Sequence, residues 1–287
     1  MALFFLCFII ALFIKDDAMT IQVSQLFHFP VKSLKGTGLQ QMTLDAFGPQ
    51  WDRRFMLIDA NGRFVTQRQC PSMGQISASV VDECLTLMFE NEKKVLNIAE
   101  INQFDQFKLV KVWDDEVNAR LIEGEINVWL SEKLKRDVTL CFMDDETHRQ
   151  VDLDFAQLGD KASFSDGFPL LIISQASIDF LSTQLGRELS VERFRPNIVV
   201  TGCEAFAEDK WQKIVINGIE FDVVKPCSRC VIPTLDLVTS EKQADVMQVM
   251  LKHRKQGKKV MMGQNALHRG LGMLEVGCKV EVVAATA

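Results

Sequence analysis

Short apolar runs separated by polar turns dominate the chain from residue 21 to about residue 122. Residues 55–59 and 63–67 flank Ala60-Asn61-Gly62. Because Asn-Gly tolerates the positive φ of a tight turn, this pattern predicts a β-hairpin. Further strands are predicted at 76–81, 85–89, 94–98 and 107–113. Several short strands with turns between them are typical of a β-barrel or a sandwich.

Helical periodicity begins after this β-rich part. Residues 123–134 place Ile126, Trp129, Leu130 and Leu134 on one face, which predicts an amphipathic helix. The segment 144–149 is polar and has no period, so we place the connection between two domains there. This connection divides the chain into a first domain at residues 20–143 and a second domain at residues 150–285.

The second domain is predicted to mix strands and helices. Ser174 is expected to cap a helix over 175–185 that ends at Gly186. A second Asn-Gly turn, Asn217-Gly218, predicts a hairpin of strands 213–216 and 219–224. The other predicted elements are strands at 170–174, 198–201 and 276–283 and a helix at 241–251. Together these elements predict a mainly β, α+β fold with two barrel-like domains and flanking helices.

Composition narrows the functional class only in part. The chain has 287 residues, of which 47% are hydrophobic and 24% are charged, as in an ordinary globular protein. A net charge of −6 argues against non-specific nucleic-acid binding but is compatible with a local basic pocket. Among eight scattered cysteines only Cys227 and Cys230 lie close together, which favours a reducing compartment with mostly buried free thiols.

The first eighteen residues differ from the rest. Residues 2–14 are an unbroken apolar run, which is too short to span a bilayer as a helix. No Lys or Arg precedes Lys15, so the segment is a poor match to a signal peptide. We favour translation starting at Met19, with a short membrane anchor as the alternative, and we leave residues 1–18 out of the fold. A cytoplasmic location is expected, with membrane contact only if this segment is a real anchor.

The thiol pair Cys227-Ser228-Arg229-Cys230 has three chemical interpretations. A zinc site lacks a second pair of ligands at normal spacing. A thioredoxin-type pair would open a helix, whereas residues 231–235 continue here as an apolar run that predicts extended chain. A single thiolate bound to a soft metal needs only one of the two cysteines. Two buried, inert cysteines remain the structural alternative.

Other segments contain polar side chains that could bind an anion. Arg195 and Asn197 flank Pro196, which stiffens the chain before an apolar strand, although an arginine is most often surface-exposed. Lys32, Ser33 and Arg53 supply donors suited to phosphate but lack a P-loop pattern. The basic run 252–259 is most often a solvated helix end, and a docking patch for an acidic redox partner is the alternative.

Taken in order, these motifs resemble the MOSC family in its two-part form, an N-terminal β-barrel domain followed by the MOSC domain. The resemblance extends from about residue 21 to residue 283. Its markers are Pro30-Val31-Lys32-Ser33, Asp52-Arg53, Val65-Thr66-Gln67-Arg68-Gln69, Ser165-Asp166-Gly167-Phe168-Pro169, Phe194-Arg195-Pro196-Asn197-Ile198-Val199, Gly202-Cys203, Ala207-Glu208-Asp209-Lys210-Trp211 and Cys227-Ser228-Arg229-Cys230. The branch it resembles contains the mitochondrial amidoxime-reducing component and bacterial N-hydroxylaminopurine-reducing proteins.

The resemblance implies a molybdenum cofactor held by one protein thiolate, which matches Cys230. It also implies that the cofactor is contacted by Lys32, Ser33, Arg53, Arg195, Asn197, Ser228 and Arg229. Asp166 would be a substrate-side or structural group. Gly167 stands where some relatives have threonine, so any contact at that position would come from the backbone.

The implied reaction is the reduction of an N–O bond in N-hydroxylated compounds to an amine and water. The chain shows no further cysteine cluster after the last predicted strand, so an iron–sulfur cluster is not expected in it. A separate ferredoxin-, flavodoxin- or reductase-type protein would then supply the electrons. The alternatives are a sulfur carrier that uses a Cys230 persulfide and a protein that stores or delivers the cofactor.

Overall fold

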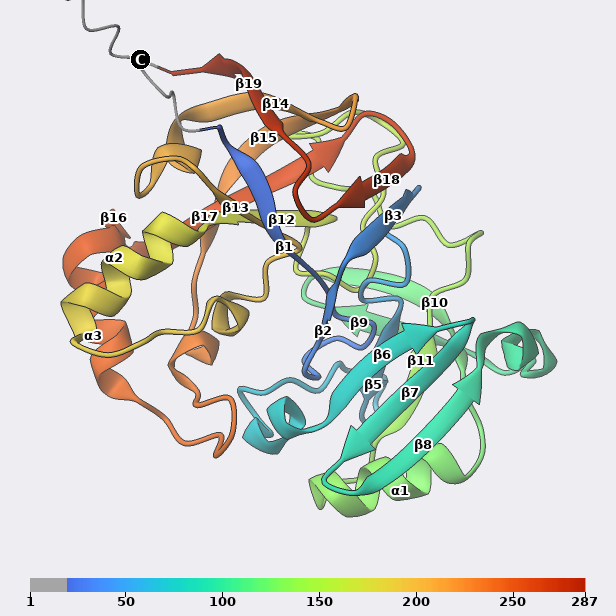
Figure 1. Cartoon of the computed structure of the whole chain (residues 1–287). Helices are drawn as coiled ribbons and strands as arrows, with labels where there is room; N and C mark the ends of the chain where they lie inside the picture. The colour runs from blue at the N-terminus through green and yellow to red at the C-terminus, as the bar shows by residue number, and fades with distance from the viewer. Residues whose placement is uncertain (1–19, 287) are drawn as a thin grey trace, which may run out of the picture.

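The computed structural model describes residues 20–286, which form two β-rich lobes (Figure 1). The prediction about residues 1–18 lies outside this range. No helix among the described residues is long and apolar enough to cross a membrane. The expected cytoplasmic location stays a prediction.

The upper lobe in Figure 1 is built on a nine-stranded sheet in the order β19-β14-β15-β17-β12-β13-β1-β2, with β16 paired to β17. Its strands are β1 (Gln22–His28), β2 (Thr37–Leu39), β12 (Leu170–Ser174), β13 (Ile198–Thr201), β14 (Trp211–Ile216), β15 (Ile219–Ser228), β16 (Lys255–Gln256), β17 (Lys259–His268) and β19 (Val280–Ala285). Helices α2 (Gln175–Leu185) and α3 (Ala244–Arg254) pack on one side of this sheet.

The central strands of this sheet are buried on both faces, as their continuous apolar sequences require. In β12, Leu170 and Ile172 pack into the core shared with β14 and β15, whereas Leu171 and Ile173 face the core under α2 and α3. Strand β13 follows β12 in parallel after α2, and a crossover helix of this kind is the usual way to connect parallel neighbours.

The lower lobe contains two further sheets and α1 (Glu125–Leu134). One sheet has the order β5-β11-β10-β9, with β5 (Phe55–Ile58), β9 (Phe107–Val112), β10 (Asp115–Leu121) and β11 (Thr139–Phe142). The other contains β6 (Ser77–Val81), β7 (Cys84–Phe89) and β8 (Glu92–Asn97). Strand β5 is also buried on both faces, because Phe55 and Leu57 pack with α1 while Met56 and Ile58 pack against β9 and β10.

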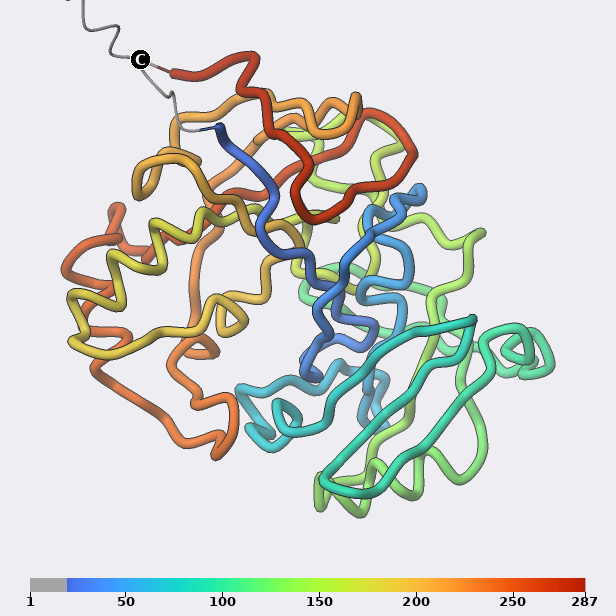
Figure 2. Tube along the Cα trace, viewed as in Figure 1, coloured from blue at the N-terminus to red at the C-terminus, as the bar shows by residue number. Residues whose placement is uncertain are grey.

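The N-terminal segment connects the two lobes. Strand β1 pairs with β13, and β3 (Gln41–Asp45) pairs with β18 (Gly272–Glu275) and with β4 (Gly48–Pro49). In the chain trace of Figure 2 this blue segment runs from the upper lobe into the lower one. The division into 20–143 and 150–285 stays a prediction, but strands of the first segment complete a sheet of the second.

Outside the pocket, three predicted elements differ from the observed ones. Residues 63–67 form no second strand, because Arg63 and Phe64 make only isolated bridges, to Lys111 and Ile58. The last strand begins at Val280 instead of residue 276, because Glu275–Cys278 closes as a turn with Gly277 at φ +94°. Helix α3 begins at Ala244 because Lys242 and Gln243 still pair with Leu235 and Thr234.

Candidate functional site

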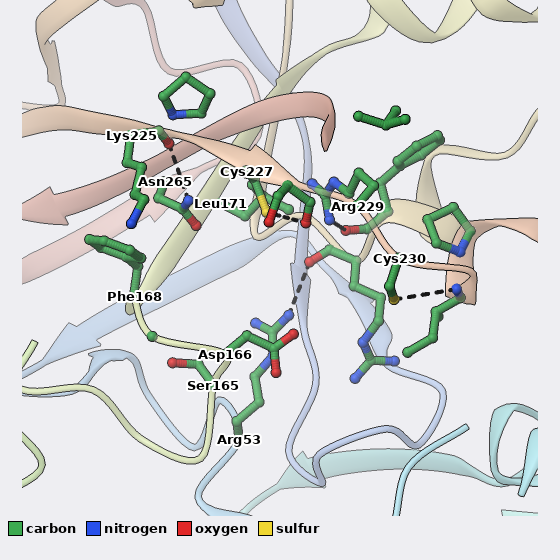
Figure 3. A pocket seen from close by; sticks show the side chains of 18 of the residues that line it. Arg53, Ser165, Asp166, Phe168, Leu171, Lys225, Cys227, Arg229, Cys230 and Asn265 are labelled. Carbon is green, nitrogen blue, oxygen red and sulfur yellow. Dashed lines mark hydrogen bonds between the residues drawn. The ribbon is translucent and has the colours of Figure 1, made fainter. Parts of the chain in front are cut away.

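A pocket of about 560 Å³ lies where the two lobes meet, and Figure 3 shows it from close by. The turn after β1, the segment before β5, the long loop 143–169 and the loop after β15 all contribute to its wall. All the predicted site residues line it: Lys32, Ser33, Arg53, Asp166, Arg195, Asn197, Ser228, Arg229 and Cys230. The fold therefore brings together side chains that come from distant parts of the sequence.

Three of these residues have backbones in the left-handed region, which is uncommon for residues other than glycine. Ser33 has φ +66°, Arg53 has φ +51° and Arg195 has φ +54°. Surrounding hydrogen bonds fix the turns: Arg53 N–H donates to the Phe29 carbonyl at 2.8 Å, and Arg195 N–H donates to the Glu192 carbonyl at 3.0 Å. Backbone strain of this type is often concentrated at functional sites.

Lys32 and Asp166 form an ion pair on one wall of the pocket. The Lys32 ammonium is buried and donates to Asp166 Oδ1 at 2.6 Å and to the Phe164 carbonyl at 2.7 Å. The carboxylate is 71% exposed and also accepts from Trp113 Nε1 at 3.2 Å. Burial lowers the pKa of Lys32, and the Asp166 charge opposes that shift.

The same contacts determine the protonation of Asp166. Partial enclosure by the pocket raises its pKa, but the Lys32 charge and the hydrogen bonds from Lys32 and Trp113 outweigh it. The pKa of Asp166 therefore lies well below its usual range. At neutral pH Asp166 is an ionised acceptor and not a proton donor.

Arg53 and Asn197 belong to one hydrogen-bond network. The Arg53 guanidinium pairs with Asp52, donates to Asn197 Oδ1 at 3.2 Å and donates to the Arg195 carbonyl at 3.0 Å. Asn197 is 1% exposed, accepts from Leu171 N–H at 3.2 Å and donates to the Phe27 carbonyl at 3.3 Å. Asn197 therefore positions Arg53 and the start of β13, and its polar groups are used within the protein.

Arg195 is a cation of the pocket wall whose hydrogen-bond donors are only partly used. Its guanidinium lies 4.2 Å from the Phe29 ring centre, and Arg53 lies 4.4 Å from the same ring. One Arg195 nitrogen donates to the Leu34 carbonyl, whereas Nη2 is buried without a partner among residues 20–286. Burial and the nearby Arg53 cation lower the pKa of Arg195 to about 9. The guanidinium is thus charged at neutral pH and lacks a full counter-charge.

The two cysteines of the pair have different surroundings. Cys227 lies in β15, and burial raises the pKa of its thiol. Cys230 follows the end of β15, and its Sγ accepts the Ile232 N–H at 3.5 Å. Because its sulfur lies on the loop of the pocket wall and acts there as a hydrogen-bond acceptor, Cys230 fits the role of a metal ligand better than Cys227. In Figure 3 the two side chains stand on either side of Arg229.

The residues after Cys230 correct one prediction. Residues 231–235 were expected to be extended, but Ile232–Thr234 forms a short 3₁₀ turn in which Thr234 Oγ1 donates to the Val231 carbonyl at 2.6 Å. This turn presents the Ile232 N–H to Cys230. The Arg229 guanidinium is bound by the carbonyls of Met262 and Phe194, so it holds the loop against β17.

Several pocket residues were not predicted from the sequence as site residues. Ser165 has a buried Oγ that bonds to no other atom of the described part of the chain, and Arg68 lies 4.6 Å from the ring of Trp113. Lys225 lies 4.1 Å from the ring of Phe155, and its carbonyl accepts from Asn265. Ser165 and Arg68 lie within the family motifs, so their positions in the sequence could have indicated that they belong to the pocket. Trp113, Lys225 and Asn265 lie outside every motif, and only the folded chain brings them to the pocket.

The donor set fits an anionic group that carries its own metal ligands. Among residues 20–286 no group of three or more His, Cys, Asp or Glu side chains could hold a metal ion. A metal at Cys230 would therefore need most of its ligands from a bound molecule. The free donors of Arg195 and Ser165 suit the anionic part of such a molecule.

Comparisons with known proteins agree with the fold. The MOSC N-terminal beta barrel domain matches residues 20–137, and the MOSC domain matches residues 159–281. Mouse mitochondrial amidoxime-reducing component 1 is 31% identical over 223 residues, which is 75% of this chain and 65% of the mouse protein. The human component 1 is 29% identical over 272 residues, covering 89% and 81% of the two chains.

The chain belongs to the MOSC family, in the form that joins an N-terminal MOSC β-barrel domain to a MOSC domain. It is similar to the mitochondrial amidoxime-reducing components over most of its length, although the match spans only 65% of the mouse protein. Among solved structures, the YUAD protein from Bacillus subtilis aligns with a TM-score of 0.44 and 12% identity, covering 92% of this chain and 95% of that one.

Proposed function

We propose that the protein binds a molybdenum cofactor in the pocket and reduces N-hydroxylated compounds. The observation that carries the proposal is the convergence of a hydrogen-bonded Cys230 sulfur with the unpartnered donors of Arg195 and Ser165 in one cavity. A soft ligand beside uncompensated positive charge suits a metal bound to an anionic organic group. The similarity to amidoxime-reducing components supports the same reaction class.

The pocket residues would divide the binding among them. Cys230 would ligate the metal, and Arg195 and Ser165 would donate to the anionic pterin and its phosphate. Lys32, Ser33, Arg53, Ser228 and Arg229 would shape the same site. Several of their donors already bind protein carbonyls or carboxylates, so these residues would act largely by fixing the pocket. When bound, the cofactor supplies a metal that accepts and returns two electrons.

The substrate side of the pocket is marked by Asp166. Its carboxylate is exposed to the cavity, ionised and oriented by Lys32 and Trp113. A carboxylate in this state accepts hydrogen bonds, so it would hold an N–H group of an amidoxime or hydroxylamine. The protons consumed in N–O cleavage would then come from solvent. Gly167 leaves space beside it, because a Cβ at that position would meet no atom within 4 Å.

The electrons would come from a separate ferredoxin-, flavodoxin- or reductase-type protein. The proposed function is therefore tested with a chemical reductant in place of this partner protein. The full chain, purified from a host that makes the cofactor, is incubated with benzamidoxime and dithionite-reduced methyl viologen. We expect formation of benzamidine and oxidation of the dye. Absence of turnover in molybdenum-loaded protein would contradict the proposal, and a persulfide on Cys230 without metal would support sulfur transfer instead.

A further inference from the structure

A group of exposed lysines stands beside the pocket, at the end of α3 and in the hairpin formed by β16 and β17. We call it the lysine rim: Lys252, Lys255, Lys258 and Lys259. Residues 252–259 contain no Asp or Glu, although the whole chain carries a net charge of −6. Among the described residues none of the four lysines has an ion-pair partner, whereas the neighbouring Arg254 is paired with Asp209 at 2.6 Å.

The lysine rim is directly connected to the loop that carries Cys230. Lys258 and Lys259 line the pocket themselves. Strand β17 begins at Lys259 and pairs with β15, with Met261 opposite Ser228. Arg229 N–H donates to the Val260 carbonyl at 2.8 Å, one residue before Cys230. A protein bound to the rim would therefore lie beside the proposed metal ligand.

Unpaired exposed cations on an acidic protein attract an acidic partner and repel basic surfaces. The rim is small and local, so it suits the acidic face of a small protein better than a nucleic acid, which would meet the negative charge elsewhere on the chain. The rim has four lysines, and they lie outside the cavity or at its mouth. A small N-hydroxylated substrate bound in the cavity does not need so many cations, so the rim fits a larger partner better.

We propose that the lysine rim is the docking surface for an acidic electron-donor protein, of the iron–sulfur or flavin class. This inference rests on the proposed function. In each cycle the docked donor gives up two electrons in total, the substrate N–O bond breaks, and two protons from water complete the amine and a water molecule. The rim would bring the donor to the side of the pocket that carries the Cys230 loop. In Figure 3, Asp166 and Ser165 stand on another segment of the pocket wall.

The test compares two charge-reversal variants of the full, cofactor-loaded chain. Lys252→Glu/Lys255→Glu changes the part of the rim that does not line the pocket. Lys93→Glu/Lys135→Glu makes the same charge change at exposed positions in β8 and after α1, on the other lobe (Figure 1). Benzamidoxime reduction is measured with reduced methyl viologen and with a reduced plant-type [2Fe–2S] ferredoxin, which is an acidic protein.

With ferredoxin at low ionic strength, we expect the rim variant to raise the KM for ferredoxin about tenfold and the control variant to leave it unchanged. High salt should raise the wild-type KM toward that of the rim variant, because exposed charges are screened. The viologen-driven rate should be the same in all three proteins. Equal ferredoxin KM values in the rim and control variants would overturn the docking surface.

A binding experiment separates this proposal from the proposed function. If the viologen assay shows no turnover, the proposed function fails, but the rim can still be tested by calorimetric titration with oxidised ferredoxin. We expect binding by the wild type and the control variant and at least a tenfold weaker Kd for the rim variant. No binding, an unchanged Kd, or binding to phosphatidylserine vesicles in place of ferredoxin would overturn it.

Discussion

At the scale of single residues, Asp166 combines an exposed carboxylate with a buried cationic partner. Lys32 is held in the protein by the Phe164 carbonyl and by Asp166, so loss of the carboxylate charge leaves the ammonium without its counter-charge. Because the pKa of Asp166 in the folded protein is below its ordinary value of 3.8, the ion pair stabilises the fold above that pH. This stabilisation is lost as the pH falls through the acidic range.

We therefore expect Asp166→Asn to lower the free energy of unfolding by about 1 kcal/mol at pH 7, a value reduced for the exposure of the carboxylate. The difference from the wild type should shrink as the pH falls below about 4, because Asp166 then binds a proton in the unfolded wild type while it stays charged in the folded ion pair. Urea unfolding between pH 7 and pH 3 measures it. Asp105→Asn, at an exposed carboxylate that pairs with no cation in the described part of the chain, is the control and should change little. A difference that does not vary with pH would contradict the ion-pair account.

Residue types indicated the pocket chemistry, but not how each residue uses its donors. Arg229 and Asn197 were predicted to contact the cofactor, and both line the pocket. Their polar groups, however, bind the carbonyls of Met262, Phe194 and Phe27. The positions of those carbonyls depend on strands that are distant in sequence, so no local pattern could reveal them. The roles of the site residues stay predictions.

At the scale of elements, the pairing of β17 with β12 and β15 holds the Cys230 loop in place. Gly263 makes the close approach to β12 possible: its φ is +73°, and a Cβ there would lie 2.4 Å from Ile173 Cγ1 and 2.8 Å from the Ile172 carbonyl oxygen. Gly218, in the turn between β14 and β15, has nearly the same φ of +76°, but a Cβ added there would meet no atom within 4 Å.

These two glycines give a matched comparison. Gly218→Ala should cost about 1 kcal/mol of unfolding free energy, because only the left-handed backbone is penalised. Gly263→Ala should cost about 3 kcal/mol or more, because overpacking against β12 is added to the same backbone penalty. Chemical denaturation of both variants measures the difference. Equal losses would show that the approach of β17 to β12 does not require glycine.

Elements with strong local signals were predicted well. The helix over 175–185 is confirmed as α2, with Ser174 Oγ accepting from Ser177 N–H and with Gly186 at φ +69°. The predicted second arm of the first hairpin was wrong, because Arg63 bridges to Lys111 of another strand. Local turn chemistry fixed the turn at Asn61-Gly62, but the partner of the following residues is decided by tertiary packing.

At the scale of the whole molecule, β1 and β3 tie the N-terminal segment to the C-terminal part of the chain, because β1 pairs with β13 and β3 pairs with β18. The same segment carries Lys32, Ser33 and Arg53 into the pocket, so the site needs both parts of the chain. The mainly β fold with an N-terminal β-barrel domain and a MOSC domain was predicted from the order of the motifs. The pairing of N-terminal strands with strands of the C-terminal part was not predicted, because pairing between residues so far apart leaves no periodic signal in the sequence.

The most direct test of the proposed cofactor site is the molybdenum content of the full chain purified from a cofactor-competent host. We expect nearly one molybdenum atom per wild-type chain. Cys227→Ala should retain it, since that thiol is held protonated by burial, and Cys230→Ala should lose most of it. A wild-type protein free of molybdenum, or equal metal in Cys230→Ala, would contradict the central claim that Cys230 holds the metal of a bound cofactor.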